Sequence, residues 1–473
     1  MLLAKWAHRE RAAYGMIRNM KTSIPANPSR PERVEAIEPA ADQPETAPSI
    51  DKIEVHRPTI IVMHASVGSG HRSAAKAVAQ AFELLRDSAD DRLRQGLAIP
   101  SDLEVEVLDV LDFGRHVFDG DHAASLFTGA TRPIYDLTWR YTFTGRLLWG
   151  GGTAWSHVNF PRFTDHVREV QPLAIVCTHI TAANVAVGAR MLADQEFPIV
   201  CIPTDYETEG LWPHRSADLF CVANESMAET LRPRLVPEDR ILITGIPTRT
   251  DFRRTYDKEE TRDRLRLPQD KRIVLVLAGA YLPRPYVHFR DAMDRLLPSL
   301  QALPNMHFVF VAGNDADYAR HLQQECESLN LGNTTVLGYV EGMAALMAAS
   351  DLAICKSGGL TVTECLCAQV PMILLGNAYG QEKANVRMLT SLGAAMHVTT
   401  ARELLDALRH IAAHPDSMHA MLVNGSFLRR PDAALDIARA TFRLAEAPKN
   451  PDDPSRKKRF VQLYWGEKPA HIR

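Results

Sequence analysis

Two short stretches combine glycines with side chains that could do chemistry. The first, GSGHRS from Gly68 to Ser73, places a histidine at the tip of a glycine turn. Glycines permit a tight turn, and a helix that begins there offers free amides to an anion or a hydroxyl group. The imidazole of His71 could then accept the proton of a bound hydroxyl. The alternative is a histidine that only hydrogen-bonds to the backbone.

The same stretch does not match the common nucleotide motifs. The dinucleotide fingerprint G-x-G-x-x-G expects Gly or Ala where Ser73 stands, and an acid about 20 residues further on. The acid at the end of the next predicted strand, Asp109, is almost twice as far away, and the P-loop signature G-K-[ST] does not follow these glycines. NAD and P-loop binding are therefore not favoured.

The second stretch, SGGLTVTE from Ser357 onward, indicates a site for a nucleoside diphosphate. A turn at Gly358 and Gly359 leads into a helix whose positive end suits a diphosphate. Glu364, expected on the first turn, offers two acceptor oxygens that match the two hydroxyls of a ribose. Thr361 and Glu364 also have the spacing of a capping box, which is the structural alternative.

A further polar cluster, Gln381, Glu382 and Asn385, follows the next strand at the start of another helix. Loops at the carboxyl ends of neighbouring parallel strands lie at the same edge of a sheet. The two clusters together predict a nucleotide-sugar site.

Parallel sheets are needed to position these loops. Apolar runs alternate with helical patterns, and the alternation restarts near Lys271, so we expect an α/β protein of two Rossmann-like domains facing each other across a cleft. Ligands would bind at the carboxyl ends of the strands. Strands are predicted at 58–66, 103–110, 173–179, 197–205, 219–224, 240–247, 272–279, 307–313, 334–340, 351–357 and 371–376.

The 473 residues divide into four parts. We expect a disordered or amphipathic extension at 1–57, an N-terminal domain at 58–250, a C-terminal domain with a closing helix at 251–447, and a basic aromatic tail at 448–473. The basic start is either a short amphipathic helix or a frayed extension, with Met20 as the true first residue. Residues 23–57 have the composition of a disordered linker.

Composition limits the class of protein. The net charge of -3 gives no general attraction for nucleic acid. Seven scattered cysteines fit a reducing cytoplasm, and Cys365 and Cys367, two apart on a predicted helix, are poor joint metal ligands. The sequence contains no apolar run of the roughly 18 residues that a membrane span needs.

Residues 113–163 predict a contact with an anionic membrane surface. Trp149 and other aromatic side chains alternate there with basic ones, including Arg140 and Arg146. Rings of this kind lie at the lipid headgroup level while arginines attract anionic lipid. We expect this segment, with Trp212, to form the acceptor entrance of a cytoplasmic protein bound peripherally to the inner face of the cell membrane. The alternative is a helical insert packed on the first sheet.

Five segments, GSGHRSAAKA, CIPTDYETEGLWPH, ILITGIPTR, KSGGLTVTECLC and YGQEKANV, resemble the monogalactosyldiacylglycerol synthases and the bacterial processive diacylglycerol glucosyltransferases. These are inverting GT-B glycosyltransferases, and the resemblance covers about residues 58–445. It implies transfer of a hexose, with inversion, from UDP-galactose or UDP-glucose to a diacylglycerol-type membrane lipid. It implies neither a cofactor nor a catalytic metal, and Asp315-Ala316-Asp317 is interpreted as a solvated loop with a helix cap.

The resemblance also implies roles for individual residues. His71 is the candidate base and Asp205 the second candidate. The donor would contact Ser357, Gly358, Gly359, Thr361, Glu364, Gln381, Glu382 and Asn385, and the acceptor Gly68, Gly70, Arg72, Trp149 and Trp212. Two other functions stay open: a UDP-sugar-binding regulator without turnover, and a UDP-sugar epimerase of the same fold. The oligomeric state stays open as well.

Overall fold

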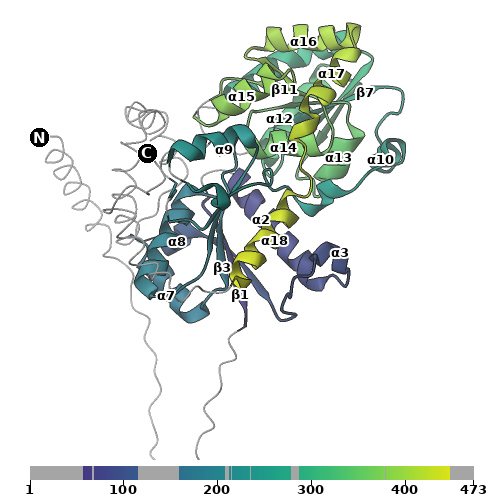
Figure 1. Cartoon of the computed structure of the whole chain (residues 1–473). Helices are drawn as coiled ribbons and strands as arrows, with labels where there is room; N and C mark the ends of the chain where they lie inside the picture. Colours follow the sequence, from purple (N-terminus) through teal and green to yellow (C-terminus); the bar gives the residue numbers. More distant parts are fainter. Residues whose placement is uncertain are drawn as a thin grey trace, which may run out of the picture. The chain divides into compact units, whose positions relative to one another are not determined.

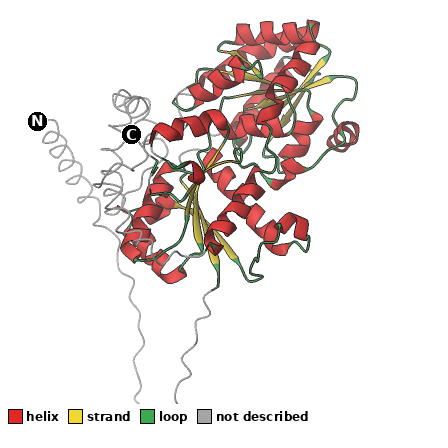
Figure 2. Ribbon diagram, viewed as in Figure 1, coloured by secondary structure: helices red, strands yellow, loops and turns green. Residues whose placement is uncertain are grey.

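The structure is a computed structural model that describes residues 57–447, apart from 67–68, 115–158, 208–211, 215, 235, 279–286 and 379. Figure 1 traces the chain and Figure 2 shows its secondary structure. Residues 1–56 of the N-terminal extension, Gly68, residues 115–158 of the aromatic segment with Trp149, and the C-terminal tail lie outside the described residues.

The first sheet has six parallel strands in the order β2-β1-β3-β4-β5-β6. Side chains alternate between its faces: Ile61 and Met63 belong to one hydrophobic cluster, and Ile60 and Val62 to another. All six strands were predicted. They are β1 Thr59–His64, β2 Glu104–Asp109, β3 Ala174–Cys177, β4 Ile199–Cys201, β5 Leu219–Val222 and β6 Ile241–Ile243.

The second sheet also has six parallel strands, in the order β12-β11-β10-β7-β8-β9. Five of them were predicted. The sixth, β12, was missed because it is a short edge strand in which an exposed His397 interrupts the apolar run. The strands are β7 Arg272–Leu277, β8 Met306–Val311, β9 Thr334–Leu337, β10 Leu352–Cys355, β11 Met372–Leu375 and β12 Ala395–Val398.

Helices connect these strands, as parallel pairing requires. Those of the first sheet are α2 Ser69–Asp87, α3 Asp91–Arg94, α7 Pro161–Val170, α8 Ile180–Ala193 and α9 Glu225–Leu231. A short 3₁₀ turn, η4 Thr250–Arg253, leads towards the second sheet. The later helices are α10 Lys258–Leu265, α11 Val287–Leu296, α12 Ala316–Ser328, α13 Met343–Ala349, α14 Gly359–Cys367, α15 Glu382–Ser391, α16 Ala401–Ala413, α17 Asp416–Gly425 and α18 Ala433–Glu446.

Helix α18 differs from its predicted place. We assigned it to the C-terminal domain, but it packs against α2 and β3 of the first sheet (Figure 1). Phe442 meets Phe82 edge to face at 5.4 Å, and the Arg439 guanidinium donates to the carbonyl of Leu93 at 3.0 Å. The apolar stripe of α18 therefore completes the core of the first domain.

In both sheets the strand order reverses at one point, and the loops that follow the two strands at that point lie side by side. In the first sheet β1 lies between β2 and β3, so the loops after β1 and β3 are neighbours. In the second sheet β10 and β7 are neighbours in the same way. Ligands of open α/β sheets bind outside the carboxyl ends of strands at such switch points. These two points are therefore the expected place of the functional site.

Phe442→Ala is expected to destabilise the first domain by about 3–5 kcal/mol, because removing a buried phenylalanine loses apolar burial and leaves a cavity. The side chain is only 2% exposed. Chemical denaturation followed by hydrogen exchange should show early opening of α2 and β3. Phe427→Ala is the matched control, because that ring is 59% exposed and should change stability little. Equal effects of the two substitutions would refute the packing role of α18.

Candidate active site

His71 lies in the first turn of α2, where bonds from two other strand ends fix its ring. Its Nδ1 is 2.9 Å from the carbonyl oxygen of Thr178 and 3.0 Å from the hydroxyl of Thr204. A carbonyl oxygen only accepts, so Nδ1 donates and carries the proton of the neutral ring. Nε2 then holds the free lone pair. One nitrogen of the ring is thus bonded to the protein, and the other can accept a proton.

The surroundings keep His71 neutral. Burial lowers the pKa of His71, Asp205 and the Thr178 carbonyl oppose this shift, and Lys356 adds to it. The ring of His179 meets that of His71 edge to face, with centroids 4.6 Å apart. A neutral imidazole with a free lone pair is the form that accepts a proton.

Asp205, the second candidate base, follows β4 and lies close enough to act on His71 electrostatically. Its Oδ1 accepts a hydrogen bond of 2.8 Å from the Asn385 side chain. No described residue hydrogen-bonds Nε2 of His71, so that atom is the better placed acceptor. His71 therefore keeps an acceptor atom that the described residues do not use, and Asp205 lies near it.

The donor loop begins where β10 ends. Gly358 is the N-cap of α14, and no side chain caps the helix. The capping box of Thr361 and Glu364, which was the structural alternative, is therefore not formed: α14 starts at Gly359, so Thr361 is its third residue and Glu364 lies on the second turn instead of the expected first. The helix starts earlier because the glycine turn itself ends the strand. The first amides of α14 are left available to an anion.

Gly359 allows two half-sites to touch: the loops of the first sheet around His71 and Asp205, and the turn of the second sheet at the start of α14. A Cβ at this position would lie 2.0 Å from the carbonyl oxygen of Thr204 and 2.8 Å from Oδ1 of Asp205. No side chain fits such an approach. On the same side, a Cβ at Gly70 would lie 3.9 Å from Cβ of Leu360, so α2 and α14 begin next to each other. The glycine turns thus bring acceptor-side and donor-side loops into contact.

Glu364 is largely buried beside η4. The pKa of Glu364 is raised to about 8, mainly by burial and also by the charge of Asp251, while Arg249 opposes the shift. Arg249 and Asp251 form an ion pair of 3.3 Å. Arg249 was not predicted as a site residue, although it ends the quoted segment ILITGIPTR, immediately before η4. Its place in the loop that follows β6 was the available signal.

The other donor-side residues take different places. Gln381 is the N-cap of α15 without a side-chain capping bond, and Glu382 lies 3.7 Å from the Lys356 ammonium. A Cβ at Gly358 would touch both Lys356 and Glu382. Lys356, also not predicted, therefore puts a positive charge beside the donor turn. Asn385 is fully buried and bonded to protein atoms, which differs from the predicted direct donor contact.

The acceptor-side residues are only partly brought together. Gly70 and the exposed Arg72 lie at the start of α2. Trp212 is 4% exposed and packs against Phe220, so it belongs to the core and cannot reach a membrane surface. The prediction that Trp212 takes part in a membrane contact is wrong, because its indole is buried in the core of the first domain.

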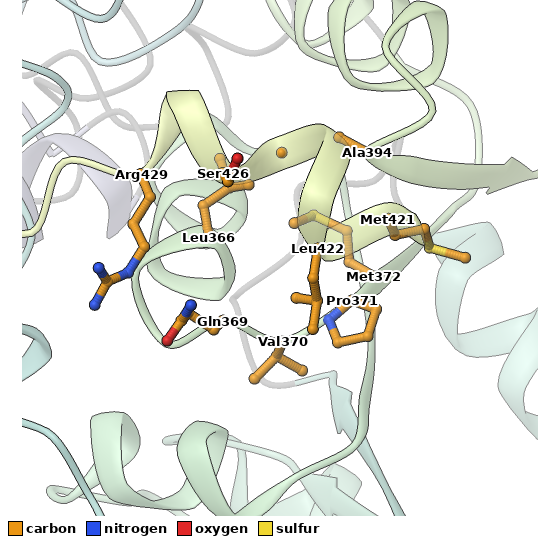
Figure 3. A pocket seen from close by; sticks show the side chains of 11 residues that line it. Leu366, Gln369, Val370, Pro371, Met372, Ala394, Met421, Leu422, Ser426 and Arg429 are labelled. Carbon is orange, nitrogen blue, oxygen red and sulfur yellow. The ribbon is translucent and has the colours of Figure 1, made fainter. Parts of the chain in front are cut away.

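A small cavity lies near the opposite end of α14 (Figure 3). Leu366 and Gln369 line it together with residues of α17. Arg429 also lines it, and its guanidinium donates a hydrogen bond to the carbonyl oxygen of Cys367. Helix α14 has nine residues, so its ends are about 13 Å apart. The cavity is thus separate from the donor turn.

Asp315 caps α12, accepting from the amide of Tyr318 at 3.0 Å, which confirms the predicted cap. Among the described residues, no cluster of three His, Cys, Asp or Glu side chains could hold a metal ion. In the same part of the chain, no helix is both long and apolar enough to cross a membrane.

Two family models match the chain. Residues 71–248 match the model described as monogalactosyldiacylglycerol (MGDG) synthase, and residues 283–430 match the glycosyltransferase family 28 C-terminal domain. Both models describe glycosyltransferase domains, and the chain is similar to each of them over a different part of its length. One match includes His71 and the other includes Gly358, so the similarity extends to the loops of both sheets.

Named relatives agree with the family. A processive diacylglycerol beta-glucosyltransferase of Bacillus cytotoxicus is 26% identical over 396 residues, which cover 81% of this chain and 93% of the relative. A protein of the same name from Bacillus licheniformis is 30% identical over 56% of this chain and 66% of its own length. Both relatives are named as glucosyltransferases.

Solved structures establish the fold. The UDP-GlcNAc 2-epimerase of Neisseria meningitidis, bound to UDP-GlcNAc, has a TM-score of 0.51 at 14% identity and covers 81% of this chain and 99% of its own. A putative UDP-N-acetylglucosamine 2-epimerase of Listeria monocytogenes has the same TM-score at 13% identity, over 84% of this chain and 99% of its own. The glycosyltransferase thus has the GT-B fold, with two Rossmann-like domains.

Glu364→Gln is expected to stabilise the free enzyme and weaken UDP binding. The folded protein holds Glu364 protonated up to about pH 8, whereas the unfolded chain releases this proton above an ordinary pKa of 4.5. Wild-type stability therefore falls across this range as pH rises, and a glutamine cannot contribute to the loss. The variant should melt at a higher temperature at pH 8 and at a similar one near pH 4.5.

The UDP affinity of the same variant should fall roughly two- to tenfold, because the protonated Glu364 makes a neutral hydrogen bond, which contributes about 0.5–1.5 kcal/mol. Calorimetry with UDP measures this. Glu259→Gln on the exposed face of α10 is the control and should alter neither property. Unchanged UDP affinity would remove Glu364 from the donor site.

Proposed function

We propose that the chain transfers a hexose from UDP-glucose or UDP-galactose to the hydroxyl of a diacylglycerol-type lipid, with inversion and without a cofactor or catalytic metal. The observation that carries the proposal is Nε2 of His71, to which no described residue hydrogen-bonds, on the side of the donor turn. Its opposite nitrogen is fixed by Thr178 and Thr204, and the Gly359 contact brings α14 next to it. The names of the family models and relatives supply the substrate classes.

The residues can perform each step of an inverting transfer. Nε2 of His71 takes the proton of the acceptor hydroxyl as its oxygen bonds to the anomeric carbon. The bond from that carbon to the UDP oxygen breaks, and UDP leaves with the electron pair. The first amides of α14, with Lys356 and Arg249, offset the charge that grows on the diphosphate. Glu364 would hold the ribose.

The alternatives are not favoured. The matched models and the named relatives belong to glycosyltransferases, and the epimerases share only the fold at low identity. A regulator without turnover has no need of a base whose tautomer is fixed. The direct test is incubation with a panel of UDP-sugars and lipids, with products identified by mass spectrometry. UDP release that does not depend on lipid would contradict transfer.

His71→Ala is expected to lower turnover by 10²–10⁴-fold, the usual cost of losing a general base, with UDP affinity changed little. Because burial lowers the pKa of His71, the acid limb of the wild-type pH profile should lie below pH 6.5. Steady-state kinetics and calorimetry check both points. Asp205→Asn is the comparison: if it alone abolished turnover while His71→Ala did not, Asp205 would be the base.

We further propose peripheral binding to the cytoplasmic face of an anionic membrane through the aromatic segment 113–163. The support is its composition of tryptophan, tyrosine and arginine, together with the lipid substrates named for the relatives.

Replacing Arg140, Arg146 and Trp149 together, by Ala, should reduce flotation with anionic liposomes and activity on lipid, while UDP binding persists. Wild-type flotation should grow with anionic lipid content and fall with salt, because exposed charges are screened. Replacing Arg402 and Arg409 of α16 gives a control with comparable loss of charge. A triple variant that floats as well as wild type would exclude the segment from membrane binding.

A further inference from the structure

Residues 204–207, which follow β4 of the first sheet, lie against α14 and α15 of the second. The Tyr206 hydroxyl is 3.0 Å from the hydroxyl of Thr363, and Glu207 accepts from Arg387 at 3.0 Å. One more side chain of this contact, Asn385 of α15, is fully buried. Unlike the two contacts above, the hydrogen bonds of Asn385 reach both the loop beside His71 and the loop that precedes the donor turn.

Asn385 uses all its polar groups within the protein. Its Nδ2 donates to Oδ1 of Asp205 at 2.8 Å and to the carbonyl oxygen of Ser357 at 2.9 Å, and its Oδ1 accepts from the amide of Tyr206 at 3.0 Å. A primary amide has two hydrogens to donate, and both are used. No donor hydrogen is left for a bound sugar or phosphate.

The three partners lie next to groups that act in the proposed reaction. Ser357 precedes the donor turn at Gly358, and Asp205 follows Thr204, whose hydroxyl contacts Nδ1 of His71. Asn385 therefore joins the loop that would hold the diphosphate to the loop that orients the base. A buried polar group of this kind is costly to disturb, because its partners are left unsatisfied.

We infer that Asn385 is a positioning residue, which fixes the base of the first domain in register with the donor loop of the second. This inference rests on the proposed transfer and replaces a direct donor contact for this side chain. Catalysis by proximity depends on such registration, since a misplacement of about 1 Å can cost 10²-fold.

Several charged or titratable groups face His71 and enter the test. Asp205 raises the pKa of His71 and Lys356 lowers it, while burial has the largest effect. Burial lowers the pKa of His179 and of His64, and the nearby His71 lowers both further. Arg72 acts on His64. Of these, only Asp205 is held by Asn385.

The experiment compares Asn385→Ala and Asn385→Asp with Tyr206→Phe. Tyr206→Phe is the matched control, since it removes the bond to Thr363 from the same interface without touching Asn385 or Asp205. For each protein we would measure kcat and KM for the UDP-sugar from pH 5 to 9, UDP affinity by calorimetry, and the titration midpoint of His71 by NMR.

For Asn385→Ala, we expect kcat to fall roughly 10- to 100-fold, with KM and UDP affinity within about threefold of wild type. The His71 midpoint should move to lower pH, because the Asp205 charge is no longer held near it. Asn385→Asp has a distinct signature: its new carboxyl shares one proton with Asp205, which restores their hydrogen bond when that proton is bound. The ratio of its kcat to that of wild type should therefore rise as pH falls. Tyr206→Phe should leave kcat within about threefold and the pH profile unchanged.

Three results would overturn the inference. Weakened UDP binding with kcat preserved in Asn385→Ala would make Asn385 a donor ligand. An equal loss of kcat in Tyr206→Phe would assign the effect to the interface as a whole. An unchanged His71 midpoint would separate Asn385 from the base. If Asn385→Ala does not fold, Asn385→Asp is sufficient for the test: a ratio of its kcat to that of wild type that does not change with pH would refute the inference. If wild type transfers no hexose, the proposed function fails, while the NMR midpoint still tests the positioning.

Discussion

The approach of the Thr204 carbonyl to Gly359 is the constraint on which the site depends. An added Cβ would lie 2.0 Å from that oxygen, so only glycine lets the loop after β4 reach the start of α14. Because of this contact, a ring held by the first sheet and a helix terminus held by the second can act on one substrate pair. Each sheet alone carries only half of the chemistry.

Burial sets the protonation states of the two half-sites in complementary directions. It keeps His71 neutral by lowering its pKa, and it keeps Glu364 protonated by raising its pKa to about 8. In water, a glutamate would be ionised at neutral pH, and a histidine would hold its proton to a higher pH than His71 does. Holding these side chains in the other form lowers the free energy of unfolding, and this cost falls at the candidate substrate site. Functional sites commonly show such perturbed groups.

Much of this site follows from the sequence, because it depends on local pattern. Eleven of the twelve strands and the ends where His71 and Gly358 lie could be predicted from apolar runs and glycines. The pattern could not show which nitrogen of His71 is free, because that depends on Thr178 and Thr204, more than a hundred residues away. The same limit applies to Asn385, whose amide pairs with a loop of the other sheet, and to α18. Glu364 was placed one turn too early because glycine and capping signals overlapped.

Helix α18 also imposes an order on the synthesis of the chain. The first domain needs its last helix to cover β3 and α2, yet roughly 190 residues separate β6 from α18. At about 5–20 residues per second, a ribosome takes about 10–40 s to make them. During that interval the apolar surface that will receive Leu435 and Phe442 is uncovered, while the second domain has already emerged. The domain that begins first is thus completed last, and nascent chains pass through a stage at which chaperones have an exposed hydrophobic face to bind.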